Sequence, residues 1–401
     1  MKILFVHREF PGQFKYISQV LAADPKNLVM FMTSDDKIPS PKNINKLVYK
    51  LPKGEIDKNS ILYEYEKSVL HGKAAANLAL ALKNKGIKPD VIYAHAWGPA
   101  MFMKDIFPDV PLLCYFEWLD RSEGAAIGFD GNLPDLNYKE QIRTNSAQKL
   151  IELYSCDAGI SPTQWQKQQF PKEFHNKIKV IHDGIDTKTC SPDSEATFLI
   201  KDKNIELTAK DEVITYATRG MEPARGFPQF IEAVDKLLKK RPNAHFIIGG
   251  DDKVHYGAQL KNKTYKQLML EKFNLKSNRV HFVGGLDFKD YIKLLQISSV
   301  HIYSTIPFIL SWSFLEAMSA GCCLVASNTA PVTEVMKDNY NGLLFDFLNV
   351  EQLVEKIEYA LNNQDKMQEI RNNARQTVLD NYDLKKLMVQ QIIYLQSLIK
   401  K

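Results

Sequence analysis

A single carboxylate, Glu316, lies within the otherwise apolar or small residues FILSWSFLEAMSAGCCLVAS of 308–327. An unpaired buried carboxylate is costly, so such a group usually has a partner or a task. We expect a helix to begin near Ser313, with Ser311 or Ser313 as its N-cap. The backbone N–H groups of Ser311, Trp312 and Ser313 would then point out of the helix start and suit a diphosphate. Glu316, in the first turn, would accept hydrogen bonds from the diol of a ribose.

Two arginines, Arg219 and Arg225, follow the apolar run 213–218 within TRGMEPARGFPQF. They flank a turn that contains Pro223 and Gly226, and this turn would let both guanidinium groups converge on one point. Arginine forks match phosphate geometry and stay charged, so the pair predicts a phosphate contact. The alternative is two exposed arginines on an ordinary loop.

Two further candidates follow strands in the first half of the chain, Gly12 after 2–6 and His95 at the end of 91–95. Gly12 would let a ligand approach the backbone at a helix start, although an ordinary tight turn is an equal alternative. His95 would hydrogen-bond a substrate hydroxyl or polarise a leaving group, unless it is a satisfied core histidine. The first strand is not followed by GxGxxG, which argues against a nicotinamide cofactor.

The elements that must hold these residues alternate between short apolar runs and longer helical patterns. Nearly continuous apolar runs are typical of parallel strands that are covered on both faces. The predicted strands are 2–6, 28–33, 91–95, 111–116, 157–161, 178–182, 213–218, 244–249, 279–284, 300–305, 322–327 and 342–345. The pattern predicts an α/β protein with two successive Rossmann-like, doubly wound domains. In such sheets ligands bind beyond the carboxyl ends of the strands, which is where the candidate residues fall.

The alternation breaks at the polar, turn-rich stretch 183–211, which indicates an interdomain connection. The final stretch has the apolar spacing of an amphipathic helix, which either packs on its own domain or crosses back to the first. The predicted division is an N-terminal domain at 1–185, a connection at 186–210, a C-terminal domain at 211–382 and a terminal helix at 383–401.

Composition limits the class of protein further. A chain of 401 residues is long enough for two domains. The formal net charge of +5 does not indicate a nucleic-acid partner, although it allows weak attraction to an anionic substrate or membrane surface. Neither a membrane-spanning run nor a signal peptide is evident, so we expect a cytoplasmic protein. The five cysteines lack metal-site spacing and are expected to be free buried thiols.

Taken together, these motifs resemble the retaining, metal-independent glycosyltransferases of family 4, which have the GT-B architecture, over nearly the whole chain. FLEAMSAGCCLVASNTAPVTEV with NGLLFD is similar to the donor-site signature of that family. TRGMEPARG is similar to its diphosphate-binding segment, with Arg225 in place of the usual lysine. RVHFVGGL resembles the segment whose backbone meets the base, near Leu286. The resemblance implies two domains that face each other across a cleft, and a C-terminal helix that crosses back to the first domain.

One departure from the family pattern concerns Phe308. The family commonly has two glutamates eight residues apart; Glu316 matches the second, and Phe308 stands where the first would be. The first usually touches hydroxyls of the transferred sugar, so the resemblance implies altered donor handling with nucleotide binding retained. His95 would position the donor sugar. The metal-independent chemistry implies that no cofactor is needed besides the nucleotide-sugar co-substrate, and GDD at 250–252 is interpreted as a turn.

The implied reaction moves a sugar from a UDP- or GDP-sugar to a hydroxyl of a glycan, lipid-linked or protein acceptor, as in bacterial surface polysaccharide or glycoconjugate synthesis. The alternative is a non-catalytic subunit of the same fold that binds a sugar or nucleotide or stabilises a partner, and Phe308 is its main support. We expect the long loop 117–140 to frame the acceptor site. The basic C-terminus allows peripheral contact with the inner face of the membrane but does not require it.

Overall fold

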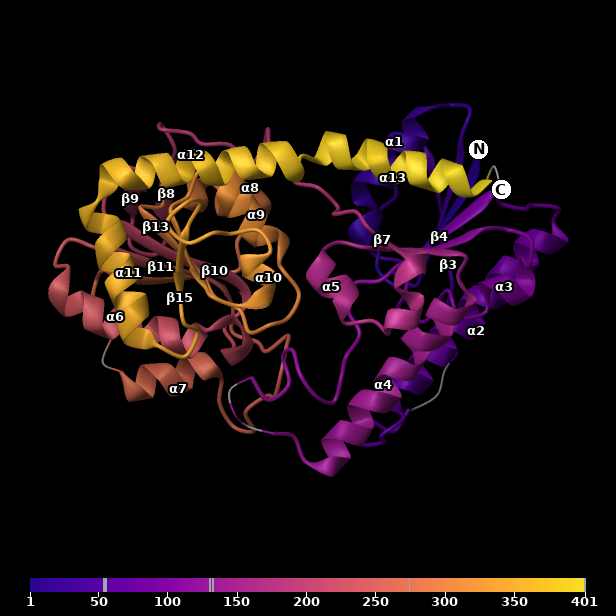
Figure 1. Ribbon diagram of the computed structural model, residues 1–401, viewed down its shortest axis with the longest axis horizontal. Coiled ribbons are helices and arrows are strands. Elements are labelled where there is room, and N and C mark those ends of the chain that lie inside the picture. Colours follow the sequence, from indigo (N-terminus) through magenta and orange to yellow (C-terminus); the bar gives the residue numbers. More distant parts are fainter. Residues whose placement is uncertain (53–55, 130, 132, 274, 400–401) are drawn as a thin grey trace. The chain divides into compact units, whose positions relative to one another are not determined.

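The chain forms two compact units in a computed structural model that describes residues 1–52, 56–129, 131, 133–273 and 275–399. The first unit comprises Met1–Asp183 and Lys385–Lys401, and the second comprises Gly184–Leu384. Figure 1 shows the elements of both units in chain order by colour. Each unit is built on its own parallel sheet, which confirms the predicted α/β class.

The first unit contains a seven-stranded sheet in the order β3-β2-β1-β4-β5-β6-β7, with every neighbouring pair parallel. The strands are β1 Lys2–Val6, β2 Leu28–Thr33, β3 Ile44–Val48, β4 Val91–His95, β5 Leu112–Tyr115, β6 Ala158–Ser161 and β7 Ile178–Val180. Strand β3 is a difference from the sequence prediction. Its sequence INKLV sits at the sheet edge and is only partly buried, so it lacks the continuous apolar run of a central strand.

Helices cover this sheet, and the C-terminal helix is one of them. They are α1 Lys15–Ala23, α2 Tyr63–Asn84, α3 Met103–Ile106, α4 Leu136–Ser155, α5 Gln164–Gln168 and α13 Leu384–Ile399, with short 3-10 turns at Gly12–Phe14 and Lys172–Lys177. On α13, Gln391 donates to the carbonyl oxygen of His182 at 3.2 Å, and the ring of Tyr394 lies 4.9 Å from Nζ of Lys179. The C-terminal helix therefore packs on the first unit, as the resemblance implies.

The second unit contains a six-stranded sheet in the order β12-β11-β10-β13-β14-β15, again with every neighbouring pair parallel. The strands are β10 Val213–Gly220, β11 His245–Asp251, β12 Val280–Gly284, β13 Val300–Tyr303, β14 Leu324–Ser327 and β15 Leu343–Phe345. Its helices are α6 Phe227–Lys240, α7 Tyr265–Lys272, α8 Phe288–Gln296, α9 Trp312–Ser319, α10 Ala330–Thr333, α11 Val350–Asn362 and α12 Gln364–Asn381, with a 3-10 turn at Pro223–Arg225.

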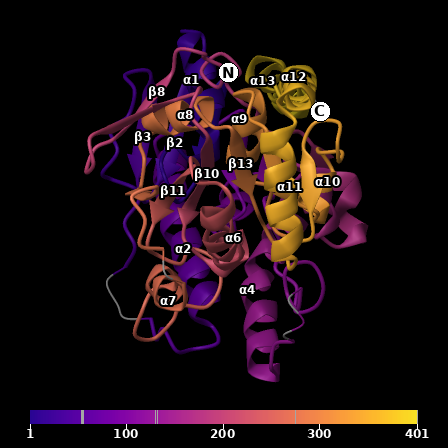
Figure 2. The same cartoon turned by 90° about the vertical axis from the view of Figure 1, so that its left-hand side faces the viewer.

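Apolar side chains pack on both faces of this second sheet. One cluster joins α6, α7 and α11 to the strands, and α6 and α11 run side by side in Figures 1 and 2. A second cluster joins α8, α9 and α10 to the strands. Burial on both faces explains why these strands read as continuous apolar runs in the sequence.

The segment 186–210, expected to be a connection without regular structure, contains an antiparallel hairpin. Its strands are β8 Thr197–Ile200 and β9 Ile205–Thr208. Phe198, Ile200 and Leu207 are buried in a cluster with residues of β10, β11 and α8, so the hairpin packs on the second unit. The alternation of apolar and polar residues over only four positions gave too short a pattern to predict it.

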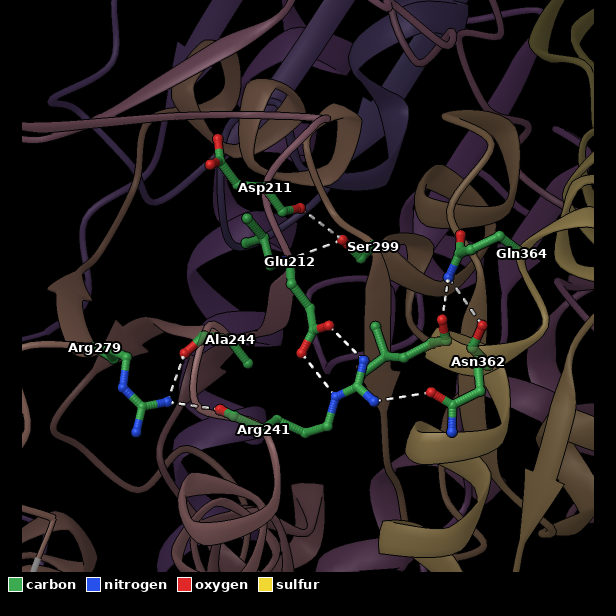
Figure 3. Close-up of polar contacts among 11 residues, drawn as sticks. Asp211, Glu212, Arg241, Ala244, Arg279, Ser299, Asn362 and Gln364 are labelled. Carbon is green, nitrogen blue, oxygen red and sulfur yellow. Dashed lines mark hydrogen bonds and ion pairs between the residues drawn. The ribbon is translucent and has the colours of Figure 1, made fainter.

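An ion-pair network fixes α6 at the end of the sheet where the strands begin (Figure 3). Arg241, just after α6, donates from Nε to Glu212 Oε1 at 2.9 Å and from Nη1 to Asn362 Oδ1 at 2.8 Å. Arg279 donates to the carbonyl oxygens of Arg241 and Ala244 at 2.8 and 3.2 Å. These bonds tie the ends of α6 and α11 to the starts of β10, β11 and β12, and leave the opposite ends of the strands to form a site.

Candidate donor site

A pocket of about 540 Å³ lies at the carboxyl ends of the strands in the second unit. The predicted site residues that line it are Arg219, Arg225, Leu286, Ser311, Trp312, Ser313 and Glu316. Six residues that were selected for their chemistry, and Leu286, which was selected through the family resemblance, therefore share one cavity. Tyr256, Asp251 and Tyr291 also line the pocket, although none of them was predicted to do so. Tyr256 lies in a loop and Tyr291 on α8, and neither belongs to a short motif. Asp251 belongs to GDD at 250–252, which was interpreted as a turn, whereas Gly250 and Asp251 are the last residues of β11.

Helix α9 begins at Trp312, with Ser311 as its N-cap. Oγ of Ser311 accepts the N–H of Ser313 at 3.3 Å, and the N–H of Ser311 donates to the hydroxyl of Tyr303 at 3.0 Å. Two of the three N–H groups that were expected to point outward therefore already have partners within the chain. A phosphate that binds either of these two N–H groups would have to replace the Ser311 or the Tyr303 hydroxyl oxygen as the acceptor.

Glu316 lies one turn into α9 and is largely enclosed. Burial raises the pKa of its carboxyl from 4.5 to about 7, and a hydrogen bond from Tyr291 on α8 moderates the rise. No cation contributes to this shift. The carboxylate is therefore a hydrogen-bond acceptor at the wall of the pocket, a character that suits the hydroxyls of a sugar rather than a phosphate.

Arg225 is the more buried of the two arginines, with 9% of its surface exposed, whereas Arg219 is exposed. Nη1 of Arg225 donates to Oγ1 of Thr305 at 2.9 Å and to the carbonyl oxygen of Ile309 at 3.4 Å. The following residue, Gly226, has a φ of +69°, and a Cβ there would lie 2.2 Å from Oγ of Ser304. Glycine is required at this point because both the backbone conformation and the close approach exclude a side chain.

Two aromatic rings lie beside the Arg225 guanidinium, those of Tyr256 and Phe308. The guanidinium carbon is 5.3 Å from the centre of the Tyr256 ring and 5.9 Å from that of Phe308, and the two ring centres are 5.1 Å apart. Oε2 of the buried Glu222 accepts the backbone N–H groups of His255 and Tyr256 at 2.5 and 3.0 Å. The loop that carries Tyr256 is therefore held by a buried carboxylate.

The two remaining candidates, His95 and Gly12, belong to the first unit. His95 is 1% exposed, and burial lowers its pKa well below the ordinary value, so its ring is neutral. Among the described residues neither ring nitrogen of His95 has a hydrogen-bond partner, and its closest aromatic neighbour is Trp97 with ring centres 4.3 Å apart. Gly12 has a φ of +50°, and a Cβ there would lie 2.6 Å from the ring of His7. Gly12 is therefore explained by close packing against His7.

A directed chain of hydrogen bonds that the sequence did not reveal runs from His7 to Glu117. Nδ1 of His7 accepts the N–H of Glu9 at 2.9 Å, so its Nε2 carries the proton and donates to Gln13 Oε1 at 2.8 Å. Nε2 of Gln13 then donates to Oε1 of Glu117 at 3.1 Å. Burial, together with Asp183, raises the pKa of Glu117 to about 7. His7 and Glu117 both follow strands, which is the only signal that could have identified them.

Metal ligands, membrane spans and cysteines were also the subject of sequence predictions. Across residues 1–52, 56–129, 131, 133–273 and 275–399, His, Cys, Asp and Glu side chains do not gather in any group of three that could hold a metal ion. Within the same ranges, every helix is too short or too polar to span a membrane. The five cysteines are all buried and free.

Comparison with known proteins identifies the family. The family described as "Glycosyl transferase family 4 group" matches residues 25–190, and "Glycosyl transferases group 1" matches residues 200–377. A glycosyltransferase of Methanocaldococcus jannaschii is 22% identical over 302 residues, which cover 74% of this chain and 72% of the relative. The N,N'-diacetylbacillosaminyl-diphospho-undecaprenol alpha-1,3-N-acetylgalactosaminyltransferase of Campylobacter jejuni is 29% identical over 213 residues.

This second match covers 52% of the chain and about half, 51%, of the Campylobacter protein. Among solved structures, that of Anabaena HepE in complex with UDP-glucose superposes with a TM-score of 0.69 at 17% identity, covering 99% of this chain and 100% of that one. The two matched segments, the two parallel sheets and the relatives agree with one another. The chain therefore belongs to the group 1 glycosyltransferases of family 4 and has the GT-B fold.

Proposed function

We propose that this glycosyltransferase uses a UDP- or GDP-sugar as its donor and transfers the sugar with retention of the anomeric configuration, without a metal ion. The acceptor is a hydroxyl of a glycan, a lipid-linked saccharide or a protein, in the synthesis of a bacterial surface polysaccharide or glycoconjugate. The observation that carries the proposal is the joint presence of Arg219, Arg225 and Glu316 in one pocket. The two arginines match the diphosphate and the Glu316 carboxylate matches the ribose of a nucleoside diphosphate. The second carboxylate of the pocket, Asp251, is paired with His255, whose Nε2 lies 3.0 Å from its Oδ1.

Departure of the nucleoside diphosphate is the step that these residues would assist. Negative charge grows on the leaving phosphate as the bond between it and the sugar breaks, and the guanidinium groups of Arg219 and Arg225 would stabilise it without a metal ion. Arg225 is suited to this task because Thr305 and the carbonyl of Ile309 already hold it in place. The acceptor hydroxyl would attack from the face that the diphosphate leaves, and its proton would pass to the departing phosphate.

Two relatives agree with this assignment. HepE was solved with UDP-glucose, and the name of the Campylobacter relative describes transfer of N-acetylgalactosamine to a lipid-linked saccharide. We infer that the acceptor binds to the first unit beside the loop 117–140, of which residues 130 and 132 lie outside the described residues. We further infer a cytoplasmic enzyme that contacts the membrane surface only peripherally, as its net charge of +5 permits.

The proposal is tested by measuring which nucleotide binds and whether it is released. UDP, GDP, ADP, CMP and NAD are titrated separately into the protein by calorimetry, with EDTA present. Selective binding of UDP or GDP, followed by acceptor-dependent release of that nucleotide from its sugar conjugate, is the expected result. Binding of NAD alone, or a requirement for a divalent cation, would overturn it.

A non-catalytic subunit of the same fold is the second candidate, because Phe308 replaces a glutamate that the family commonly has. Such a subunit would bind the nucleotide sugar without releasing the nucleotide. The release assay therefore separates the two functions, provided that a mixed cell-wall and lipid extract serves as the acceptor source.

A further inference from the structure

An aromatic corner, formed by Tyr256 and Phe308, borders the buried arginine of the donor pocket. Tyr256 lines the pocket, and Phe308, which is outside the set of lining residues, packs against the Tyr256 ring with ring centres 5.1 Å apart at an angle of 60°. Both rings are partly exposed. An aromatic side chain that is neither fully buried nor freely solvated, next to a ligand cavity, offers an apolar surface to whatever enters the cavity.

The corner lies on the Arg225 side of the pocket. Arg225 is in contact with both rings, whereas the Glu316 carboxylate contacts Tyr291 on α8. If Glu316 holds the ribose and Arg225 the diphosphate, the group beyond the diphosphate is the transferred sugar. This step rests on the proposed function, because it takes the order of the ligand's parts from it.

The corner is held in a fixed position from both sides. On one side the buried Glu222 accepts the backbone N–H groups of His255 and Tyr256. On the other side the N–H of Phe308 donates to the carbonyl of Ile306 at 2.6 Å, and Arg225 reaches the carbonyl of Ile309 in the same loop. A surface that is organised in advance loses little conformational freedom on binding and therefore discriminates between ligands.

The chemistry of the corner disfavours a sugar hydroxyl. The side chain of Phe308 can neither donate nor accept a hydrogen bond, so a hydroxyl buried against it would lose its bond to water without replacement. A methyl group in the same place would instead gain from leaving water. Two common changes to a hexose supply such a methyl, namely 6-deoxygenation and N-acetylation.

We propose that the aromatic corner selects a donor whose transferred sugar presents a methyl group, as a 6-deoxyhexose or an N-acetylhexosamine does. Phe308 is the specificity-determining residue. Burial of one methyl group corresponds to about a fourfold gain in affinity, and the avoided loss at a buried hydroxyl adds to it. We expect methyl-bearing donors to bind at least about fourfold more tightly than their hydroxyl counterpart.

The test is a calorimetric titration of the full-length protein with UDP, UDP-glucose, UDP-6-deoxyglucose and UDP-N-acetylglucosamine. Each affinity is expressed relative to that of UDP, which reports on the nucleotide site alone. Tighter binding of UDP-6-deoxyglucose identifies the C6 methyl as the recognised group, and tighter binding of UDP-N-acetylglucosamine identifies the acetamido methyl. If the protein binds GDP and not UDP, GDP-mannose and GDP-6-deoxymannose form the corresponding pair, with an N-acetylated GDP-hexosamine as the third member.

Two variants then assign the preference to Phe308. Phe308→Glu introduces a hydrogen-bond acceptor and is expected to abolish or reverse the preference for the methyl-bearing donor. Its carboxylate would lie beside Arg225, so each donor affinity is again expressed relative to that of UDP for the same variant. Phe308→Leu is the matched control, which remains apolar and should keep the preference. Both variants are compared with the wild type by thermal unfolding, and the wild-type titrations stand independently of either variant.

The outcomes separate this inference from the proposed function. If UDP binds but UDP-glucose binds as tightly as both methyl-bearing donors, the aromatic corner does not select a methyl group and the inference is wrong, while the nucleotide site stands. If neither UDP nor GDP binds, the proposed function itself fails. A preference that persists unchanged in Phe308→Glu would also overturn the role of Phe308.

Discussion

Removal of the exposed arginine, Arg219→Ala, should weaken UDP binding while leaving the fold intact. Arg219 lies at the end of β10 with its side chain exposed, so truncation removes few packing contacts. A hydrogen bond to a charged group contributes about 1.5–3 kcal/mol, which corresponds to an increase in Kd of about 10- to 150-fold. Solvent screening at an exposed side chain favours the lower part of this range, about 10- to 30-fold.

The assay is isothermal titration calorimetry with UDP at physiological salt and again at about 0.5 M salt, where exposed charges are screened. Lys276→Ala is the matched control. Lys276 is an exposed cation of the same unit that precedes β12, whereas the pocket lies beyond the other end of that strand, so its removal changes the net charge equally. The control should bind UDP like the wild type. The reasoning is refuted if Arg219→Ala weakens UDP no more than Lys276→Ala does, or if the loss is the same at high salt.

Three further predictions concern buried groups. Because burial raises the pKa of Glu316 to about 7, UDP affinity should rise by up to about tenfold from about pH 6 to about pH 8 as the carboxylate ionises. Glu316→Gln should lose this pH dependence. A calorimetric pH profile that is the same in the variant and the wild type would contradict the prediction. Burial raises the pKa of Glu152 from 4.5 to about 8. Between these two pH values the folded protein keeps a proton on Glu152 that the unfolded chain loses. The free energy of unfolding of the wild type therefore falls as pH rises through that interval. In urea unfolding, the free energy of unfolding of Glu152→Gln minus that of the wild type should therefore increase with pH, by at most about 1.4 kcal/mol per pH unit. A difference that does not change with pH would refute the assignment. Gly226→Ala should lower the free energy of unfolding by about 2–4 kcal/mol, because the residue has a φ of +69° and no room beside Ser304; a Tm equal to that of the wild type would show that the turn can rearrange.

Much of the fold was predictable because it depends on local patterns. Runs such as 2–6 and 300–305 are apolar throughout, and that composition is characteristic of strands covered on both faces. The parallel order follows from the alternation of strands and helices. The edge strand Ile44–Val48 and the hairpin at 197–208 were missed, since partly exposed, short strands carry a weak periodic signal.

The candidate site was predictable only where chemistry and strand ends coincide. Arg219 was identified because it follows an apolar run, and Glu316 because it is a lone carboxylate within one; the structure brings both to one pocket. Tyr256 and Glu222 were not identified. They are 34 residues apart in the sequence, and their hydrogen bond depends on the conformation of the loop that carries Tyr256. The occupied N–H of Ser313 follows from Ser311 as the N-cap, one of the two caps that the sequence predicted, because an N-cap side chain accepts such an N–H.

The chain from His7 to Glu117 illustrates a second limit. Its bond between Gln13 and Glu117 joins residues that are 104 positions apart, and only the order of β1, β4 and β5 in the sheet brings them together. A histidine after one strand and a glutamate after another are unremarkable in sequence. Their directed hydrogen bonds become visible only in three dimensions.

The most direct test of the central claim is the crystal structure of the protein with UDP bound. The account predicts that the ribose hydroxyls donate to Glu316, that the diphosphate lies between Arg219 and Arg225, and that the terminal phosphate faces the aromatic corner of Tyr256 and Phe308. Density for UDP elsewhere in the protein, or in this pocket with the base against the arginines, would contradict the assignment of the donor site and every inference that depends on it.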